Sequence, residues 1–496
     1  MRRVWNRFFP SGVCRSRGFS HLSLETINQK VVGAEYAVRG QIVIKAEEYK
    51  RRLKDGDTSL PFDEIVSCNI GNPQELQQRP ISFFRQVLAL CTYPALLEDP
   101  NITSMFNQDA IDRAREYLEI VPGGSGAYSH SMGVYGIREK VSRFIEKRDG
   151  YPSDPERIFL TDGASSAVQM CLQLSIRGPQ DGIMVPIPQY PLYSASIAMH
   201  GGTQVDYFLD ESKRWGTDMK ELERAYQGAK SKGTDVRGLV VINPGNPTGQ
   251  CLEEAIMRDI VSFCEEYNVT LFADEVYQTN IYSSTPFTSF KKVVMDMGES
   301  AKSVSLVSFH SVSKGFLGEC GRRGGYMEIH NMEDEVVMQL YKLASVTLCS
   351  NLDGQIMTGL MVEPPQLGAV SHDSYEKERE DILHSLQARS VSLVQALNSL
   401  EGVSCNLVEG ALYAFPSIKL PEKAIEAAKK EGKAPDLFYC LQLLDETGVV
   451  VVPGSGFGQE EGTFHFRTTI LPPPEKIEAV TGRVAEFHKK FMETYS

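Results

Sequence analysis

Short apolar runs alternate with amphipathic stretches through the middle of the chain, from about residue 138 to 330. The runs are bounded by Gly, Pro, Asn or Asp and read "RIFLTDG", "GIMVPIP", "RGLVVINP", "VTLFADE", "SVSLVSF" and "GGYMEI". Short apolar strands separated by helical patterns are typical of an α/β domain with a mostly parallel sheet. We expect a ligand site at the carboxyl ends of these strands, because unusual residues follow them each time.

The two ends of the chain show other patterns. Residues 25–53 alternate charged and apolar positions and predict a helix, and "DEIVSCNIGNPQ" after them predicts a strand that ends in a Gly-Asn-Pro turn. From about 371 a long charged amphipathic helix is followed by strand signals in "GALYAF", "GVVVVP" and "TFHFRTTIL". This part predicts a separate, smaller α+β domain.

Composition restricts the function classes. With 496 residues, 42% of them hydrophobic, the chain is longer than one compact domain usually is. Its 51 basic and 64 acidic residues give a net charge of −13, which argues against nucleic acid and anionic membranes as partners. No apolar run is long enough to span a bilayer. The ten cysteines include no C-x-x-C pair, so we expect reduced thiols, without a zinc site or disulfide framework.

The N-terminal segment has the composition of a transit peptide. No acidic residue precedes Glu25, and five arginines alternate with Val4, Trp5 and two phenylalanines. "RGFS" at 17–20 resembles a mitochondrial processing site cut after Phe19, so we expect a matrix protein whose residues 1–24 form a presequence. A plastid or cytoplasmic location, with the segment as a basic tail that carries no address, remains the alternative.

One lysine stands out among the candidate chemical groups. In "SFHSVSKGFLGECGRRGG", residues 308–325, Lys314 follows an apolar run and lies among small hydroxyl residues, with Arg323 in a glycine-rich segment after it. A buried ammonium group is costly without a partner or a chemical role. The position therefore needs an explanation from the rest of the chain.

A strand, a glycine turn and a helix start follow one another in "LTDGASSAVQMCL", residues 160–172. The unpaired N–H groups at such a helix start, near Ala164 and Ser165, would bind a phosphate. An ordinary serine-capped helix is the alternative.

Two further strand ends carry polar groups. In "VINPGNPTG" a proline restrains Asn246 to an extended conformation, so its amide can donate to an anionic oxygen; a plain turn is the alternative. "LFADEVY" ends a strand with Asp274, which would be costly in a core without a cation, and Tyr277 follows; an Asp-Glu helix start is the alternative. "PQYPLY" adds aromatic rings that could stack on a flat ligand.

Together these parts match the needs of pyridoxal phosphate. Lys314 would form a Schiff base with its aldehyde, an aspartate would pair with the pyridinium nitrogen, and the helix start would hold the phosphate. Ser311, Ser313 and Arg323 would reach the phosphate or order the loop that does.

From about residue 60 to the C-terminus the chain resembles the fold type I aminotransferases. The motifs "NPGNPTG", "ADEVY" and "SVSKGFLGECGRRGG" are similar to the alanine aminotransferase group within them. The resemblance implies a seven-stranded, mostly parallel sheet in a large cofactor domain at 121–370. It also implies a smaller domain built from 371–496 and part of 25–120, which includes an N-terminal arm.

The resemblance also implies roles for individual residues. Lys314 carries the cofactor, Asp274 holds the ring nitrogen protonated, Asn246 and Tyr277 bind the phenolic oxygen, and Tyr190 stacks on the ring. Ala164, Ser165, Ser311 and Arg323 hold the phosphate, and Tyr128 reaches the site across a homodimer. Arg467 binds the substrate carboxylate, Gly71 lies in the substrate loop, and no metal is implied. Arg322 competes with Arg323 for the phosphate, although the spacing from Lys314 favours Arg323.

The implied reaction is ping-pong transamination between L-alanine and 2-oxoglutarate, which yields pyruvate and L-glutamate. The nearest alternative is a glutamate:glyoxylate aminotransferase, which shares every residue named above. The final "TYS" is not the peroxisomal signal that this alternative often carries. A pyridoxal phosphate lyase such as aminocyclopropane-carboxylate synthase is a rival of another reaction type. A cofactor-sensing regulator without catalysis is a rival of another class, but it would need a DNA-binding module for which the chain has no room.

Overall fold

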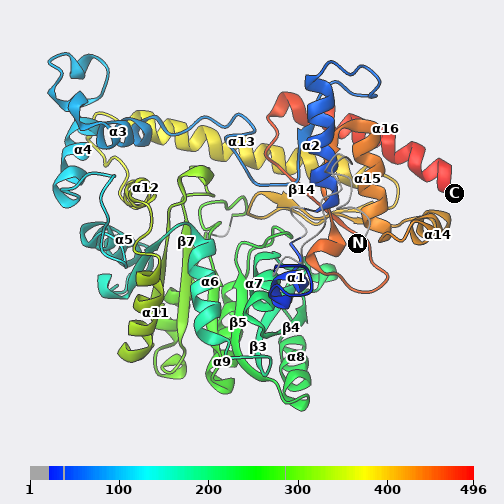
Figure 1. Cartoon of the computed structure of the whole chain (residues 1–496), viewed down its shortest axis with the longest axis horizontal. Helices are drawn as coiled ribbons and strands as arrows, with labels where there is room; N and C mark the ends of the chain where they lie inside the picture. Colours follow the sequence, from blue (N-terminus) through cyan, green and yellow to red (C-terminus); the bar gives the residue numbers. More distant parts are fainter. Residues whose placement is uncertain (1–21, 37–39, 285) are drawn as a thin grey trace.

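The computed structural model of the chain describes residues 22–36, 40–284 and 286–496 (Figure 1). Most of the predicted presequence, including the processing site after Phe19, lies outside the described residues. The predicted helix over residues 25–53 is two helices, α1 (Gln29–Gly33) and α2 (Gln41–Lys54).

A seven-stranded sheet forms the centre of the molecule, with strand order β2-β8-β7-β6-β5-β3-β4. All neighbouring pairs are parallel except those of β8, which runs antiparallel to both β2 and β7. The strands are β2 (Ile158–Thr161), β3 (Asp181–Ile187), β4 (Thr203–Phe208), β5 (Asp235–Ile242), β6 (Thr270–Asp274), β7 (Leu306–Ser311) and β8 (Gly325–His330). The predicted mostly parallel seven-stranded sheet is therefore confirmed.

Residues of the central strands alternate between two apolar cores. In β5, Leu239 and Val241 face one core, whereas Val240 and Ile242 face the other. Because both faces are buried, the strands read as continuous apolar runs, which made them visible in the sequence. β4 contains exposed Asp206 and partly exposed Thr203 and Gln204, and its mixed sequence lacks that signal.

Helices cover both faces of the sheet (Figure 1). One core contains α8 (Met219–Ser231), α9 (Glu254–Tyr267) and α10 (Phe290–Met297). The other contains α6 (Ala164–Ser175), α7 (Leu192–His200) and α11 (Asp334–Val346).

A third core lies at the β2 side of the sheet. It joins α3 (Ser82–Thr92), α4 (Gln108–Ile120), α5 (Tyr135–Asp149) and α12 (Leu352–Val362). Helices from before residue 121 thus pack against helices that follow it. The division of the chain into domains at residues 120 and 370 stays a prediction.

The smaller α+β part combines both ends of the described chain. Strand β1 (Val66–Ser67) pairs in parallel with β12 (Val449–Val450), so residues of "EIVS" and "GVVVVP" form one small sheet. β14 (Phe466–Thr469) lies between β10 (Tyr413–Ala414) and β13 (Val452–Pro453). The remaining elements are β9 (Val403–Ser404), β11 (Ser417–Ile418), α14 (Glu422–Lys430), α15 (Pro435–Thr447) and α16 (Pro474–Tyr495).

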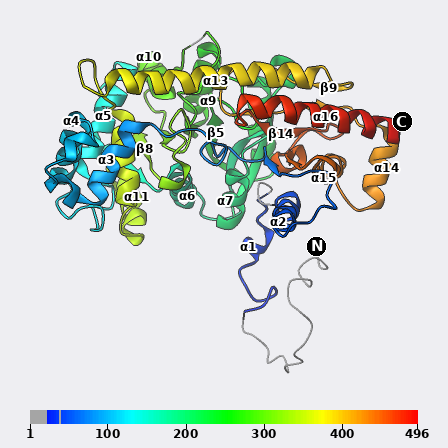
Figure 2. The same cartoon turned by 90° about the horizontal axis from the view of Figure 1, so that it is seen from above.

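The predicted long helix near residue 371 is α13 (His372–Asn398). It runs across the whole molecule from the side of α3 to the side of α16, as both views show (Figures 1 and 2). Short 3-10 helices occupy Pro94–Glu98, Ile102–Ser104, Pro155–Arg157, Glu211–Lys213, Gly298–Ala301, Cys320–Arg322 and Gly454–Phe457. Within the described residues, no helix is apolar over enough length to cross a bilayer.

A buried ion pair ties α10 to β8. Lys291 Nζ donates to Glu328 Oε1 and, at 3.1 Å, to the carbonyl oxygen of Pro152, and both charged side chains are less than 5% exposed. The hydroxyl of Ser153 donates to the same carboxylate oxygen at 2.6 Å. Because a buried carboxylate without its cation is strongly unfavourable, this pair should matter for stability.

Lys291→Met should therefore lower the free energy of unfolding by about 3–5 kcal/mol, because it leaves Glu328 buried without a cation. The neighbouring Lys292 is a matched control, since it pairs with Asp296 on the solvent side and is 38% exposed. Lys292→Met should cost only about 0–1 kcal/mol. Urea denaturation of both variants measures the difference, and equal small losses would contradict the argument.

Candidate active site

A cavity of about 550 Å³ lies at the carboxyl ends of the parallel strands. The structure brings eleven of the predicted site residues to its lining: Gly71, Ala164, Ser165, Tyr190, Asn246, Asp274, Tyr277, Ser311, Lys314, Arg323 and Arg467. Ser313, which the sequence also indicated, lines it as well. The predicted location of the ligand site at this edge of the sheet agrees with the lining.

Asp274 is the last residue of β6 and is fully inside the protein. One of its carboxylate oxygens accepts a hydrogen bond from the hydroxyl of Tyr193 at 2.8 Å, and the N–H of Val276 lies 3.5 Å from the other. Burial raises the pKa of Asp274 to about 6, although Tyr193, the N–H of Val276 and the charge of Lys314 oppose the change. A further cation or N–H donor in the cavity would stabilise this carboxylate.

Lys314 follows β7 and reaches across to the segment after β1. Its Nζ donates to the carbonyl oxygen of Gly71 at 3.0 Å and lies 5.9 Å from the centre of the Tyr277 ring. A Cβ on Gly71 would lie 2.4 Å from the Tyr413 hydroxyl and 3.1 Å from Lys314 Nζ. Glycine therefore allows this backbone to pack against the Tyr413 hydroxyl, which a side chain at position 71 would displace.

The loop around Lys314 is held from behind. The N–H of Gly315 donates to Asn280 Oδ1 at 2.8 Å, and Gly315 has a φ of 69°. Any Cβ at Gly315 would collide with the Thr279 hydroxyl at 2.4 Å. The segment that follows β6 thus fixes the backbone next to the lysine.

The start of α6 and the guanidinium of Arg323 face one another. Gly163 precedes the helix with a φ of 74°, and a Cβ there would lie 2.5 Å from Arg323 Nη2. Arg323 donates to the carbonyl oxygens of Asp162 at 3.0 Å and Cys320 at 2.9 Å, and to the Ser313 hydroxyl at 3.3 Å. Helix N–H groups, a guanidinium and a hydroxyl at one place form an anion cradle.

The choice between the two arginines follows from their positions. Arg323 lines the cavity, whereas Arg322 lies outside its lining and approaches Glu319 at 4.0 Å and Asp353 at 3.8 Å. The spacing argument in favour of Arg323 thus agrees with the geometry.

Arg467, in β14, is a buried cation that connects the α+β part to the large sheet. It is 1% exposed and donates to Asn246 Oδ1 at 3.0 Å and to the carbonyl oxygen of Asn69. Its guanidinium lies 4.1 Å from the centre of the Tyr413 ring and 4.7 Å from that of Phe457. Its Nε has no hydrogen-bond partner among the described residues. A buried guanidinium that lies beside a cavity and has an unpaired donor suits an anionic ligand.

A search with family models matches residues 107–484 of the chain to "Aminotransferase class I and II". The chain belongs to this aminotransferase family. Members of the family depend on pyridoxal phosphate and act on amino acids and 2-oxo acids. The predicted family and enzyme class are confirmed.

Three relatives of this aminotransferase show how far the similarity extends. Alanine aminotransferase 2, mitochondrial, of Arabidopsis thaliana is 56% identical over 99% of this chain and 92% of its own. Probable alanine aminotransferase, mitochondrial, of Dictyostelium discoideum is 54% identical over 96% and 90%. Glutamate–glyoxylate aminotransferase 2 of Arabidopsis thaliana is 51% identical over 96% and 97%. The mitochondrial relatives confirm the predicted localisation.

Among solved structures, alanine aminotransferase from Pyrococcus furiosus superposes with a TM-score of 0.72 at 24% identity. The match covers 93% of this chain and 99% of that one. At this level of identity the likeness concerns the fold, and it confirms the fold class.

Tyr128 is the one predicted site residue outside the cavity lining of the aminotransferase. Its side chain is 81% exposed, and the next residue, Ser129, donates its N–H to Cys349 Sγ at 3.5 Å. Within one chain Tyr128 therefore takes no part in the site. Its predicted role across a dimer stays a prediction.

The sequence reasoning missed several lining residues of the aminotransferase, namely Tyr36, Ile70, Asn72, Val168, Leu192, Ile242, Val276, Cys320, Gly321 and Tyr413. Tyr413 matters most, because its hydroxyl accepts the N–H of Gly71 at 3.1 Å. Burial would raise the pKa of Tyr413, but the charges of Lys314 and Arg467 hold it below its ordinary value. The motif "GALYAF" predicts only a strand. Its sequence does not indicate that Tyr413 lies near two cations.

Two other tyrosines support residues that the sequence did indicate. The hydroxyl of Tyr36 lies 3.0 Å from that of Tyr190, so the N-terminal segment contributes to the rim of the cavity. Tyr193, the buried partner of Asp274, stands three positions after Tyr190 in "PQYPLY". The sequence did contain a signal for Tyr193, because it is an aromatic residue three positions after Tyr190 at the start of a helix.

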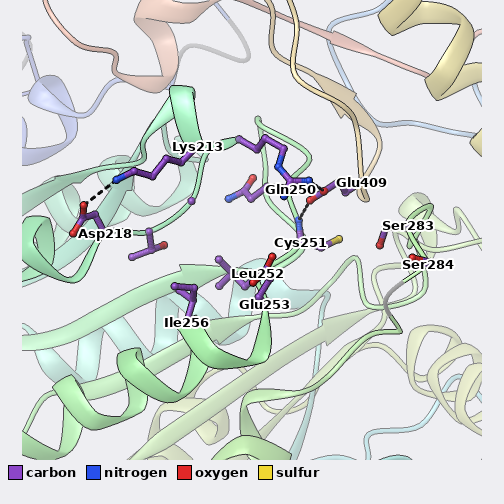
Figure 3. A pocket seen from close by; sticks show the side chains of 13 residues that line it. Lys213, Asp218, Gln250, Cys251, Leu252, Glu253, Ile256, Ser283, Ser284 and Glu409 are labelled. Atoms are coloured by element: carbon purple, nitrogen blue, oxygen red, sulfur yellow. Dashed lines mark hydrogen bonds and ion pairs between the residues drawn. The ribbon is translucent and has the colours of Figure 1, made fainter.

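A second cavity, of about 630 Å³, lies between the loops after β4 and β5 and Glu409 of the α+β part (Figure 3). Its basic residues are paired with its own acids. Lys213 approaches Asp218 at 3.3 Å, while Glu409 accepts from Arg214 at 2.9 Å and from the N–H of Cys251 at 3.2 Å. It contains none of the predicted catalytic residues.

Proposed function

We propose that this chain is an alanine aminotransferase that converts L-alanine and 2-oxoglutarate to pyruvate and L-glutamate on pyridoxal phosphate. The observation that carries the proposal is that Lys314, Asp274 and Arg467 line one cavity. The identity of 54–56% to relatives named alanine aminotransferase supports the choice of substrate pair.

The residues of the cavity fit pyridoxal phosphate. Asp274 is a buried carboxylate whose pKa burial raises to about 6, and the pyridinium N–H would supply it with a close cationic partner. Arg323, Ser311 and the first N–H groups of α6, at Ala164 and Ser165, would hold the phosphate. Tyr190 would stack on the ring, and Asn246 and Tyr277 would donate to its phenolic oxygen. Since Asn246 Oδ1 accepts from Arg467, its amide N–H groups remain free for this role.

When bound, pyridoxal phosphate supplies an aldehyde that joins amines and a ring that takes up electrons from the substrate Cα. Asp274, as a buried anion at the end of β6, would keep the ring nitrogen protonated. Lys314 would hold the cofactor, and its amine, when free, would carry a proton to or from the substrate Cα. The contact between its Nζ and the carbonyl of Gly71 keeps the ammonium inside the cavity.

Arg467 would bind the α-carboxylate of every substrate. Its contacts with Asn246 and the carbonyl of Asn69 fix the guanidinium, and its rigid fork then sets the direction of the Cα–H bond. Gly71, in the segment beside the lysine, would line the substrate side. The same site serves both half-reactions, in ping-pong order.

The glutamate:glyoxylate reaction is the second candidate. It is favoured by the relative at 51% identity, whose similarity extends over the same length. The residues assigned above fit both reactions, because both use the same cofactor contacts and the same carboxylate group.

The purified enzyme, assayed with both substrate pairs, should show the higher kcat/KM with alanine and 2-oxoglutarate. Lys314→Ala should abolish both activities while retaining pyridoxal phosphate without a borohydride-reducible bond, because the cradle and Asp274 are intact. A higher kcat/KM with glutamate and glyoxylate would show that the enzyme is a glutamate:glyoxylate aminotransferase instead. Substantial turnover by Lys314→Ala would refute the assignment of the lysine.

Arg467→Ala should lower the affinity or the rate for both amino acids and both keto acids by roughly 30-fold to several thousandfold. The reason is that lost charge-assisted hydrogen bonds cost about 2–5 kcal/mol. Arg467→Lys keeps the charge without the fork and should restore only part of the activity. The absorbance of bound cofactor should persist in both variants. If Arg467→Ala lost the cofactor but its remaining holoenzyme bound alanine normally, the substrate role would be wrong.

We also propose that the enzyme is a homodimer. Tyr128 and four other large apolar side chains are strongly exposed, and these are Tyr135, Met338, Val346 and Leu348. They belong to segments that contact one another, because Ser129 bonds to Cys349 and His130 stacks on Tyr341 at 5.3 Å. Asn351 donates to the carbonyl oxygen of Arg323 at 3.0 Å, so this apolar surface adjoins the phosphate cradle. A symmetric partner would cover it and bring Tyr128 to the other cavity.

Light scattering during gel filtration should find the active species at twice the mass of the chain. Val346→Asp, at a side chain 79% exposed, should shift it toward monomer and reduce cofactor retention. Val391→Asp on α13, also exposed, is the control and should leave the mass unchanged. A fully active monomer would exclude the dimer.

A further inference from the structure

A third cavity, of about 630 Å³, adjoins the loop that carries Lys314. Its walls are α5, the end of α12 and the first turns of α13, all at the left of Figure 1. Ser311 and Lys314 line both this cavity and the cofactor cavity. Phe316 and Leu317, from the same loop, also line it. The volume is that of a site for a small organic molecule.

The charge of this lining is opposite to that of the chain. Six basic side chains line the cavity against two acidic ones, Glu363 and Glu376, although the whole protein carries a net charge of −13. The cavity in Figure 3 differs, because its lysine and arginine are paired with its own acids. A local excess of positive charge in a concave site concentrates anions.

The basic residues differ in how far they are already neutralised. Lys140 forms ion pairs with Glu116 and Glu363. Arg148 donates two hydrogen bonds, of 2.6 and 2.7 Å, to the carboxylate of Asp149. Arg379 donates to Glu376 at 2.5–3.0 Å.

Two basic side chains remain available at the mouth of the cavity. Arg143 is 58% exposed and forms a long ion pair, of 3.7 Å, with Glu363, whose other oxygen bonds to Lys140. Lys147 is exposed and forms no ion pair with any described residue. The two stand four positions apart on α5 and so share one face of the helix.

The interior of the cavity is apolar, with one unsatisfied polar group. Phe144, Phe316, Leu317, Met361, Val362 and Tyr375 line it, and the rings of Phe316 and Tyr375 meet edge to face at 6.2 Å. His310 is 3% exposed, and its Nδ1 has no partner among the described residues. Burial and the nearby Arg148 lower the pKa of His310 to about 3, so the imidazole is neutral and can bond to an uncharged polar group.

We propose that this cavity binds an organic anion with an aromatic or apolar body, whose phosphate or carboxylate is held by Arg143 and Lys147. The apolar body lies against Phe316 and Leu317, on the loop that carries Lys314. Thr279 lines the cavity and stands between Gln278, which accepts from Arg148 at 3.0 Å, and Asn280, which holds Gly315, so the ligand lies against the segment that supports the lysine loop. The anion site at Arg143 and Lys147 is distinct from the proposed substrate site, because Arg467 lines only the cofactor cavity.

The test uses the holoenzyme and the fluorescent aromatic anion anilinonaphthalene sulfonate as the probe. The probe should bind saturably, and the variant Arg143→Glu with Lys147→Glu should raise its Kd about tenfold or more. Lys429→Glu with Lys430→Glu on α14 makes the same charge change far from the cavity, and it should leave the Kd within about twofold, because exposed charges at a distance are screened. Equal Kd values for all three proteins, or equal losses in both variants, would overturn the proposal.

Competition then identifies the anionic group. Phenyl phosphate and benzoate share a ring and differ only in that group, so the one that displaces the probe at lower concentration from the wild type names the preferred class. Met361→Trp, which adds bulk to a half-buried wall, should weaken probe binding by a similar factor without any change of charge. Displacement by neither compound, or unchanged binding in Met361→Trp, would mean that the probe binds elsewhere and that the proposal is wrong.

Discussion

The cost of burying charge governs the organisation of this enzyme. Asp274, Arg467 and the pair of Lys291 and Glu328 all lie within the protein at 5% exposure or less. A structural pair such as Lys291 and Glu328 is satisfied within the chain. Asp274 and Arg467 are only partly satisfied, and both border the cofactor cavity. The unsatisfied part of each charge is what a cationic ring nitrogen and a substrate carboxylate would complete.

The loop of Lys314 contacts both the segment after β1 and the segment after β6. Its lysine reaches the carbonyl of Gly71 in the segment after β1, and its glycine is held by Asn280 after β6. Tyr413 from the α+β part binds the N–H of Gly71, so that part reaches the same place. A displacement of any of these segments would therefore move the lysine. A ligand bound in the third cavity would lie against the same loop.

Arg467, the proposed substrate residue, makes a contact between the two parts of the fold. Arg467 belongs to β14 of the α+β part, whereas its acceptor Asn246 follows β5 of the large sheet. The guanidinium packs between the rings of Tyr413 and Phe457, which hold it flat. Because the α-carboxylate is common to all substrates, the proposed contact would serve both half-reactions, and the preference between alanine and other amino acids would then come from other residues of the lining.

Much of the fold could be predicted from the sequence, because the information was local. Strands buried on both faces read as apolar runs, and six of the seven were recognised in this way. β4 was missed because its exposed edge position permits polar residues such as Asp206. The eleven site residues that line the cavity were found because their motifs at strand ends match a known family; Tyr128 remains a prediction that concerns a second chain.

The sequence by itself determined which elements form and which side chains carry the chemistry, since periodicity and motifs depend only on neighbouring residues. Only the tertiary structure decided which of them meet. Lys314 and Gly71 are 243 positions apart, and Arg467 and Asn246 are 221 apart, so no local pattern reports their contact. The same holds for Tyr413, whose lowered pKa depends on two cations from distant segments, and for the third cavity, which adjoins the loop of Lys314. Packing brings these groups together, because hydrophobic burial selects the arrangement of elements and electrostatic partners follow from it.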